Sequence, residues 1–91
     1  DEALAQAEQA IKTQPGFVQA YNVRGLALQA LERKDEALVA YAAALAQSPN
    51  DADALFNKGE VLRQMGNQDG ALTALERATQ AAAQGSRVWV K

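Results

Sequence analysis

Cysteine and histidine are both absent from this chain, and aromatic residues make up only 5% of it. Without cysteine there are no disulfides, thiolate zinc ligands or thiol nucleophiles, and without histidine the commonest metal ligand and general base is missing. Hydrophobic residues nevertheless reach 48%, and much of that fraction is alanine, which packs backbones closely but buries little area. This composition favours packed helices around a thin core and excludes most familiar active sites.

The charge balance also excludes classes of partner. Nine Lys and Arg residues stand against eleven Asp and Glu, for a formal charge of −2. A phosphate backbone needs a basic surface, so nucleic acid is not expected as a partner. No apolar run approaches the roughly 20 residues that cross a bilayer, so membrane insertion is not expected either.

The compartment stays open. The sequence begins at Asp1 rather than Met, so a targeting segment removed earlier would leave no trace. A cysteine-free composition suits the cytosol and the periplasm alike, and we favour the cytoplasm.

The sequence repeats itself with a step of 34 residues. The tetrapeptide Asp-Glu-Ala-Leu at residues 1–4 recurs at residues 35–38 and, as Asp-Gly-Ala-Leu, at residues 69–72. Other pairs that keep this step are Pro15 and Pro49, Ala20 and Ala54, Gly25 and Gly59, and Leu28 and Leu62. A fixed period of this length is typical of proteins whose units stack side by side.

Each unit divides into two helices. Over residues 18–31 apolar side chains recur at three- and four-residue spacing, as one face of a helix requires. Residues 32–34 form a polar turn, after which Asp35 serves as N-cap or first-turn acid of a second helix. Residues 48–51 end that helix because proline cannot continue it.

The following unit repeats this plan. Asn50 or Asp51 can cap its first helix over residues 52–65, a turn follows at residues 66–68, and a second helix starts near Asp69. Gly25 and Gly59 fall in the middle of first helices, where glycine costs about 0.8 to 1 kcal/mol relative to alanine. We therefore expect a close helix crossing at each glycine, against small Ala37 or Ala71 of the paired helix.

The unit resembles the tetratricopeptide repeat, whose pattern is W-x2-L-G-x2-Y, then A-x3-F, then P, over 34 residues. The matching residues of the first complete unit are Tyr21, Gly25, Leu28, Ala37, Tyr41 and Pro49. Those of the second are Leu55, Gly59, Leu62, Ala71 and Leu75, with Ala83 at the proline place. One departure is that Arg24 and Lys58 replace the leucine before each glycine. A long cation can lay its methylenes along the groove, so the fold survives this change.

The resemblance implies an all-α solenoid of antiparallel helix pairs in a right-handed superhelix, with about five helices and a partial one. The single domain of residues 1–91 divides into the second helix of a partial repeat (1–17), two repeats (18–51 and 52–85) and the start of a further repeat (86–91). We expect a segment of a longer solenoid, since no polar capping helix is visible at either end.

The resemblance also implies a protein-binding scaffold, because first helices of such arrays line a concave groove that holds a peptide or a partner's helix. The side chains turned toward that groove are Gln19, Asn22, Leu26, Gln29, Asp53, Phe56, Asn57, Glu60 and Arg63. Leu26 and Phe56 are its apolar anchors; the alternative is that they pack against neighbouring units. The partner is a protein or peptide of unknown identity.

A second hypothesis is a structural segment that self-associates through its ends. Leu4 and Ile11 at one end and Trp89 at the other would expose apolar stripes, so a homo-oligomer is possible through them. Trp89 would stand on the tryptophan place of a further first helix.

Catalysis is not expected, and neither is a cofactor or a metal. Acidic pairs such as Asp35 with Glu36, and Asp51 with Asp53, lie at helix starts, where capping explains them. Ser48 and Ser86 have no base to activate them, and the glycines form no phosphate-binding motif.

Overall fold

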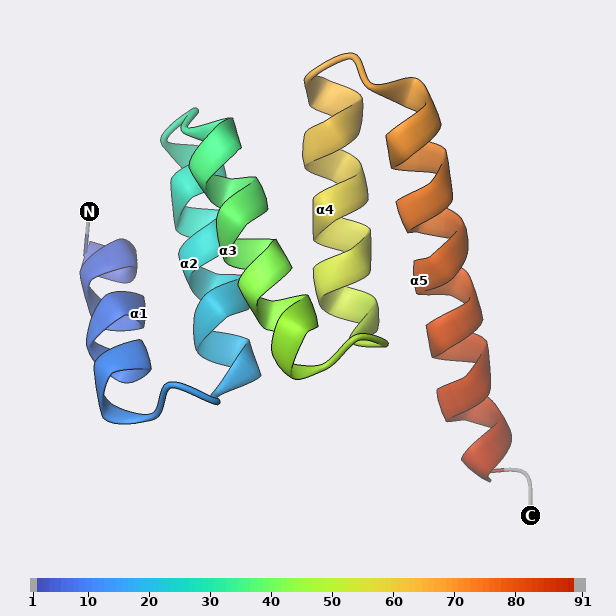
Figure 1. Ribbon diagram of the computed structural model, residues 1–91, viewed down its shortest axis with the longest axis horizontal. Coiled ribbons are helices and arrows are strands. Elements are labelled where there is room, and N and C mark those ends of the chain that lie inside the picture. Colours follow the sequence, from blue (N-terminus) through green and yellow to red (C-terminus); the bar gives the residue numbers. More distant parts are fainter. Residues whose placement is uncertain (1, 90–91) are drawn as a thin grey trace.

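The computed structural model describes the backbone of residues 2–89 and the side chains of residues 2–83. The helices are α1 (Glu2–Thr13), α2 (Val18–Ala30), α3 (Lys34–Gln47), α4 (Ala52–Gln64) and α5 (Gln68–Trp89). They stand side by side in chain order, with α2 and α4 running one way and α1, α3 and α5 the other (Figure 1). The expected all-α solenoid of antiparallel helix pairs is confirmed.

The turns repeat as the sequence does. Asp51 is the N-cap of α4 and its carboxylate accepts a hydrogen bond of 3.0 Å from the backbone N–H of Ala54. No side chain caps α3, which begins at Lys34, so Asp35 acts as a first-turn acid. Glu32 after α2 and Gly66 after α4 stand 34 positions apart, and both have positive φ, 64° and 86°.

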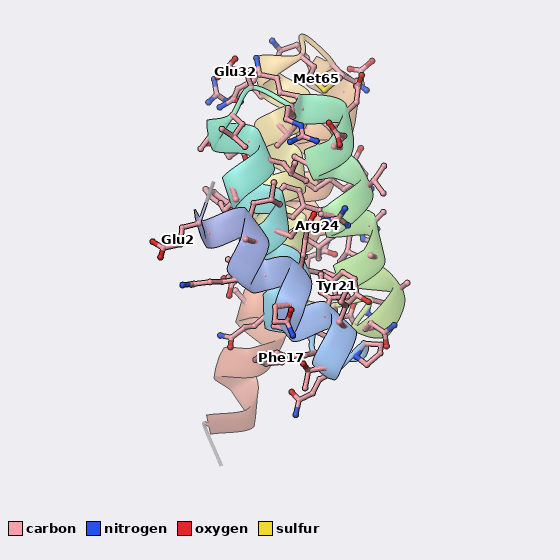
Figure 2. The ribbon with its side chains drawn as sticks, turned by 90° about the vertical axis from the view of Figure 1, so that its left-hand side faces the viewer. Glu2, Phe17, Tyr21, Arg24, Glu32 and Met65 are labelled. Carbon is pink, nitrogen blue, oxygen red and sulfur yellow. The ribbon has the colours of Figure 1, made fainter. Side chains whose placement is uncertain are left out.

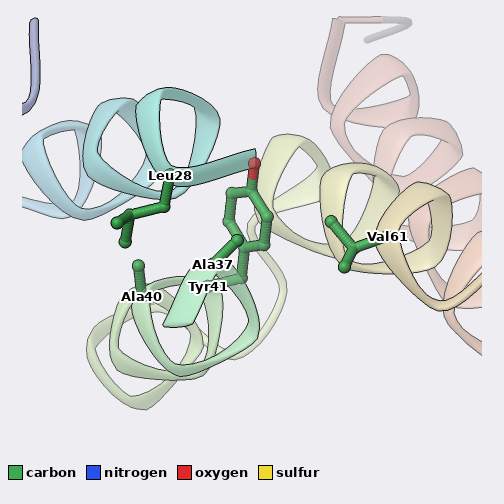
Figure 3. Close-up of a cluster of buried hydrophobic side chains, with 5 residues drawn as sticks. All are labelled: Leu28, Ala37, Ala40, Tyr41 and Val61. Carbon is green, nitrogen blue, oxygen red and sulfur yellow. The ribbon is translucent and has the colours of Figure 1, made fainter. Parts of the chain in front are cut away.

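The core is small and centred on α3. Leu28 of α2, Ala37, Ala40 and Tyr41 of α3 and Val61 of α4 form one buried cluster (Figure 3). The Tyr41 side chain is fully buried, and Figure 3 shows its ring reaching between α2 and α4. One aromatic ring therefore joins two consecutive units.

Gly25 and Gly59, the glycines in the middle of α2 and α4, mark close helix contacts, as expected. A methyl group at Gly25 would overlap the ring of Tyr41, and one at Gly59 would lie 2.8 Å from Cγ of Leu75 and 3.3 Å from the carbonyl oxygen of Ala71. The neighbour of Gly25 is thus Tyr41 rather than Ala37. In both units the nearest side chain at the gap is a large one, Tyr41 or Leu75, and in the second unit the backbone of the expected Ala71 also lies beside it.

The expected boundary after residue 85 does not end a helix. Instead, α5 continues to Trp89 without a break. The physical reason is that Ala83 stands at the place that Pro49 holds in the preceding unit. Alanine, unlike proline, keeps its backbone N–H and does not clash with the preceding turn of the helix. The side chain of Trp89 lies outside the described residues, so its part in a further repeat stays a prediction.

Candidate functional site

The residues expected to line one groove do not share one surface. The structure distributes them over a hollow between the last turns of α2 and α4, two hollows at the two ends of the stack, and the buried contact between α2 and α4. We call the hollow between α2 and α4 the inner hollow. The two hollows at the ends of the stack are the α1/α2 hollow and the α4/α5 hollow.

The inner hollow is an open depression of about 330 Å³ that combines an apolar side chain with two amides. Its lining residues are Leu26, Gln29, Ala30, Glu32 and Gln64. Leu26 is 48% exposed, which leaves a free apolar contact surface. Figure 2 shows Glu32 and Met65 at the same end of the molecule, where α2 and α4 finish.

The two glutamines of the inner hollow are linked to the core. The hydroxyl of Tyr41 donates a 2.9 Å hydrogen bond to Oε1 of Gln29, and Nε2 of Gln29 lies 3.5 Å from Oε1 of Gln64. The Tyr41 bond fixes which end of the Gln29 amide faces outward. Adjacent first helices therefore present amide groups at a shared surface, able both to donate and to accept.

Charges near the inner hollow are paired. The guanidinium of Arg63 donates to Glu60 at 2.9 Å within α4, and this hydrogen bond raises the pKa of Arg63. Lys34 lies 3.4 Å from the carboxylate of Glu32 at the rim. Because both carboxylates have cationic neighbours, the hollow offers no strong net field to a ligand.

Asn22 is 7% exposed and lies between α2 and α4 rather than on an open surface. Its Nδ2 donates a 2.9 Å hydrogen bond to the carboxylate of Asp51, the N-cap of α4. Its Oδ1 is buried and has no partner among the described residues. Asn57, also expected in the groove, is half-buried on α4. Asn22 thus ties two units together instead of facing a ligand.

The α4/α5 hollow, also about 330 Å³, takes up two of the expected groove residues. It is lined by Ala52, Asp53, Phe56, Leu75, Ala78, Thr79 and Ala82. Phe56 is 51% exposed there. The helical wheel places Phe56 on the same groove face as Leu26, whereas the fold places Phe56 in a hollow against α5.

The α1/α2 hollow holds about 210 Å³ at the opposite end and receives Gln19. Its lining residues are Gln6, Ala7, Ala10, Phe17, Gln19, Ala20 and Val23. Phe17 and Val23 are each 43% exposed, and Phe17 lies near the start of α2 (Figure 2). Leu4 and Ile11 of α1 are half-buried, and Leu4 packs against the core.

Several lining residues were not expected from the sequence, among them Phe17, Glu32 and Gln64. Gln64 directly follows Arg63, so a helical wheel that assigned a wider arc to the groove face would have included Gln64. Phe17 precedes its helix, where periodicity gives no signal.

Within the described part of the chain, no three Asp or Glu side chains gather closely enough to hold a metal ion. None of the described helices is long and apolar enough to cross a membrane.

The repeated sequence matches a known protein family. The sequence profile of the family described as "Tetratricopeptide repeat" matches residues 1–51 and 24–86. A search of curated proteins finds no significant match.

Solved structures share the fold. The structure described as "Crystal structure of MamA" superposes with a TM-score of 0.86 at 20% identity, over 92% of this chain and 49% of that one. "MamA MSR-1 C2" gives 0.85 at 25% identity, over 93% and 49%. "MamA AMB-1 C2221" gives 0.81 at 26% identity, over 89% and 48%. The chain therefore spans about half the length of these structures.

Proposed function

The chain belongs to the tetratricopeptide repeat family, and from that premise we propose that it binds a peptide segment of a partner protein at the inner hollow. The family fold is a protein-interaction scaffold. The hollow lies across two first helices, so a bound segment contacts both complete units.

The observation that carries this proposal is the pair of amides beside an exposed leucine. Gln29 and Gln64 lie 3.5 Å apart on neighbouring helices, and the side-chain amide can both donate to and accept from a peptide backbone. Leu26, 48% exposed, provides an apolar contact for one side chain of the segment. An extended segment satisfies both requirements, since its backbone groups are free and its side chains alternate.

Binding at this surface is weak and reversible, because the hollow is far smaller than a standard protein interface. Specificity comes from the residue that packs on Leu26. The paired charges of Glu60 and Arg63 contribute little unless the partner displaces one of them.

A display library of random nonapeptides tests the proposal. Peptides enriched on the wild-type protein are measured against Leu26→Ser, Gln64→Ala and the control Val39→Ser, which alters a 65% exposed valine on α3. We expect Leu26→Ser and Gln64→Ala to weaken binding about tenfold or more, and Val39→Ser to leave it unchanged. No enrichment, or enriched peptides indifferent to both inner-hollow variants, contradicts the proposal.

Self-association through the ends is the second candidate, supported by the two apolar end hollows. Rigid stacking of two copies is opposed by the repeat geometry. If α2 of a second copy packs on α4 and α5 as α4 packs on α2 and α3, its α1 takes the place of α5. Two intact copies therefore collide in this repeat-like arrangement, which requires one copy to release a helix.

A further inference from the structure

A second hollow between α4 and α5 holds two cations. Its volume is about 260 Å³, and its lining residues are Leu55, Lys58, Leu62, Gly70, Thr73, Ala74 and Arg77. Neither Lys58 nor Arg77 forms an ion pair with a residue that the structure describes. We call this surface the basic hollow.

The basic hollow lies on the side of α4 and α5 that faces α3. Arg77 donates a 3.4 Å hydrogen bond to the carbonyl oxygen of Pro49, in the turn between α3 and α4. The lining positions on α5, which are 70, 73, 74 and 77, form one stripe of that helix, whereas the α4/α5 hollow uses positions 75, 78, 79 and 82.

A following repeat would leave the basic hollow open. In the first unit, Val61 of the following helix packs in one cluster with Tyr41, the equivalent of Leu75. Because Leu75 lines the α4/α5 hollow, a further helix belongs on that stripe of α5. The basic hollow lies instead among α3, α4 and α5, which the chain itself contains (Figure 1).

The first unit has two carboxylates at the equivalent place. Arg24, the equivalent of Lys58, lies 3.7 Å from the carboxylate of Glu8 on α1. The pKa of Glu36 is lowered mainly by the hydrogen bond from Arg33 and further by the charge of Arg24. One cation thus has acidic side chains on two neighbouring helices.

The second unit has lost both carboxylates and gained a cation. A step of 34 residues relates Glu8 to Ala42, Glu36 to Gly70 and Ala43 to Arg77. Alanine and glycine are smaller than glutamate, so these exchanges also leave space beside the cations. Two positive charges therefore line a hollow at the place where the first unit has carboxylates.

The lining residues define the group that the basic hollow accepts. Lys58 and Arg77 provide charged N–H donors, and Leu55 and Leu62 provide an apolar wall. Thr73 already donates its hydroxyl to a backbone carbonyl at 3.1 Å. Two donor groups beside an apolar wall suit a carboxylate on a methylene stem better than a phosphate, whose three oxygens need more donors.

An apolar stripe of α3 borders this place. Ala42, at the position of Glu8, is exposed, and Val39, three residues earlier on the same stripe, is 65% exposed. A side chain next to the bound carboxylate can pack on Val39, which a free small carboxylate cannot do. The stripe therefore favours a protein segment as the source of the carboxylate.

We infer that the basic hollow binds a glutamate side chain of a partner protein, with an apolar neighbour of that glutamate on Val39. The Glu8–Arg24 pair shows the same arrangement within the chain. The site is separate from the inner hollow, which α2 and α4 line at their last turns, and goes beyond the peptide binding proposed there.

Two blocked pentapeptides, Ala-Leu-Glu-Leu-Ala and Ala-Leu-Gln-Leu-Ala, serve as probes, with butyrate and inorganic phosphate as free anions. Binding is followed by NMR titration of the isotope-labelled chain. The Glu peptide should bind about fivefold more tightly than the Gln peptide, since only a carboxylate pairs with the cations. It should bind about fivefold more tightly than butyrate because of the contact with Val39. Shift changes should centre on Lys58, Gly70 and Arg77.

The decisive variant is Ala42→Glu, which restores the carboxylate of the first unit at an exposed position without removing a cation. It should weaken binding of the Glu peptide about threefold, as should Lys58→Gln and Arg77→Gln. Arg63→Gln, which removes an exposed cation elsewhere on α4, is the matched control and should have no effect. Circular dichroism checks that each variant folds.

Four outcomes would overturn the inference. Equal binding of the Glu and Gln peptides would show that the charge has no part. Butyrate binding as tightly as the Glu peptide would make the ligand a free carboxylate, and tighter binding of phosphate would make it another anion. Loss of binding in Leu26→Ser would place the peptide in the inner hollow. Failure of the nonapeptide screen at the inner hollow leaves these measurements untouched, so the two proposals fail separately.

Discussion

The ring of Tyr41 occupies the space that a side chain at Gly25 would fill. A glycine in the middle of α2 weakens the helix by about 1 kcal/mol relative to alanine. The loss is offset because the ring, fully buried, passes between α2 and α4 and joins two units. The same arrangement recurs, with a smaller side chain, between Gly59 and Leu75.

Gly25→Ala should therefore destabilise the fold although alanine is the better helix former. Overlap with a buried ring costs about 1–3 kcal/mol, which outweighs the gain of about 1 kcal/mol in helix propensity. Urea unfolding measures the difference. Gly16→Ala is the control, since the nearest atom to its methyl group would be Oε1 of Gln47 at 3.8 Å. A stabilised Gly25→Ala protein would show that Tyr41 has room to move.

The contact between Asn22 and Asp51 should show energetic coupling. Asp51→Ala removes both the cap of α4 and the 2.9 Å bond to Asn22, and costs about 1–2 kcal/mol. Asn22→Ala costs about 1–3 kcal/mol because the lost bond is to a charged group. The double variant should cost less than the sum by about 0.5–1.5 kcal/mol. Gln19→Ala with Asp53→Ala, an exposed pair on the same two helices, should be additive in the same urea experiments.

Much of the fold follows from the repeat, and much of the site does not. Asp51 is recognisable as a cap because capping is local, and Gly25 as a close contact because a helical glycine needs an explanation. The sequence analysis named Ala37 as the neighbour of Gly25, whereas the structure places Tyr41 there. The side chain that fills such a gap depends on how the two helices cross, which the sequence does not give.

The groove residues illustrate the same limit. A helical wheel shows that Asn22 and Phe56 lie on one kind of face, but exposure depends on whether another helix lies over it. For Asn22 that helix is α4, while Phe56 has no such cover among the described residues. Similarly, α5 continues past residue 85 because alanine at position 83, unlike proline, does not end a helix.

Replacing Glu32 by glycine should stabilise the fold. Its φ of 64° lies in the left-handed region, and the equivalent turn after α4 has Gly66 with φ of 86°. A left-handed conformation strains a residue with a Cβ, so Glu32→Gly should stabilise the fold by about 0.5–1 kcal/mol. Gly66→Ala should destabilise it by a similar amount. Thermal unfolding of both variants, with Glu36→Gly inside α3 as a control that must destabilise, tests the assignment.

Alkaline unfolding should report the burial of Tyr41. Burial raises the pKa of Tyr41 from 10.0 to about 12, because the phenolate loses its hydration in the core. Between these two pH values the unfolded chain releases the phenolic proton while the folded chain retains it. Stability is therefore complete below pH 10 and falls as pH rises toward 12.

The size of this effect follows from the shift. Two pKa units correspond to a limit of about 2.7 kcal/mol reached only above pH 12, of which about 2.3 kcal/mol should appear as the loss in urea stability between neutral pH and pH 12. Tyr41→Phe loses the 2.9 Å hydrogen bond to Gln29 and so begins about 1 kcal/mol less stable, but it has no phenol to ionise at this position. Its stability should thus fall less steeply above pH 10 than that of the wild type, and the two curves should converge or cross. Parallel curves would mean that Tyr41 reaches solvent before the chain unfolds.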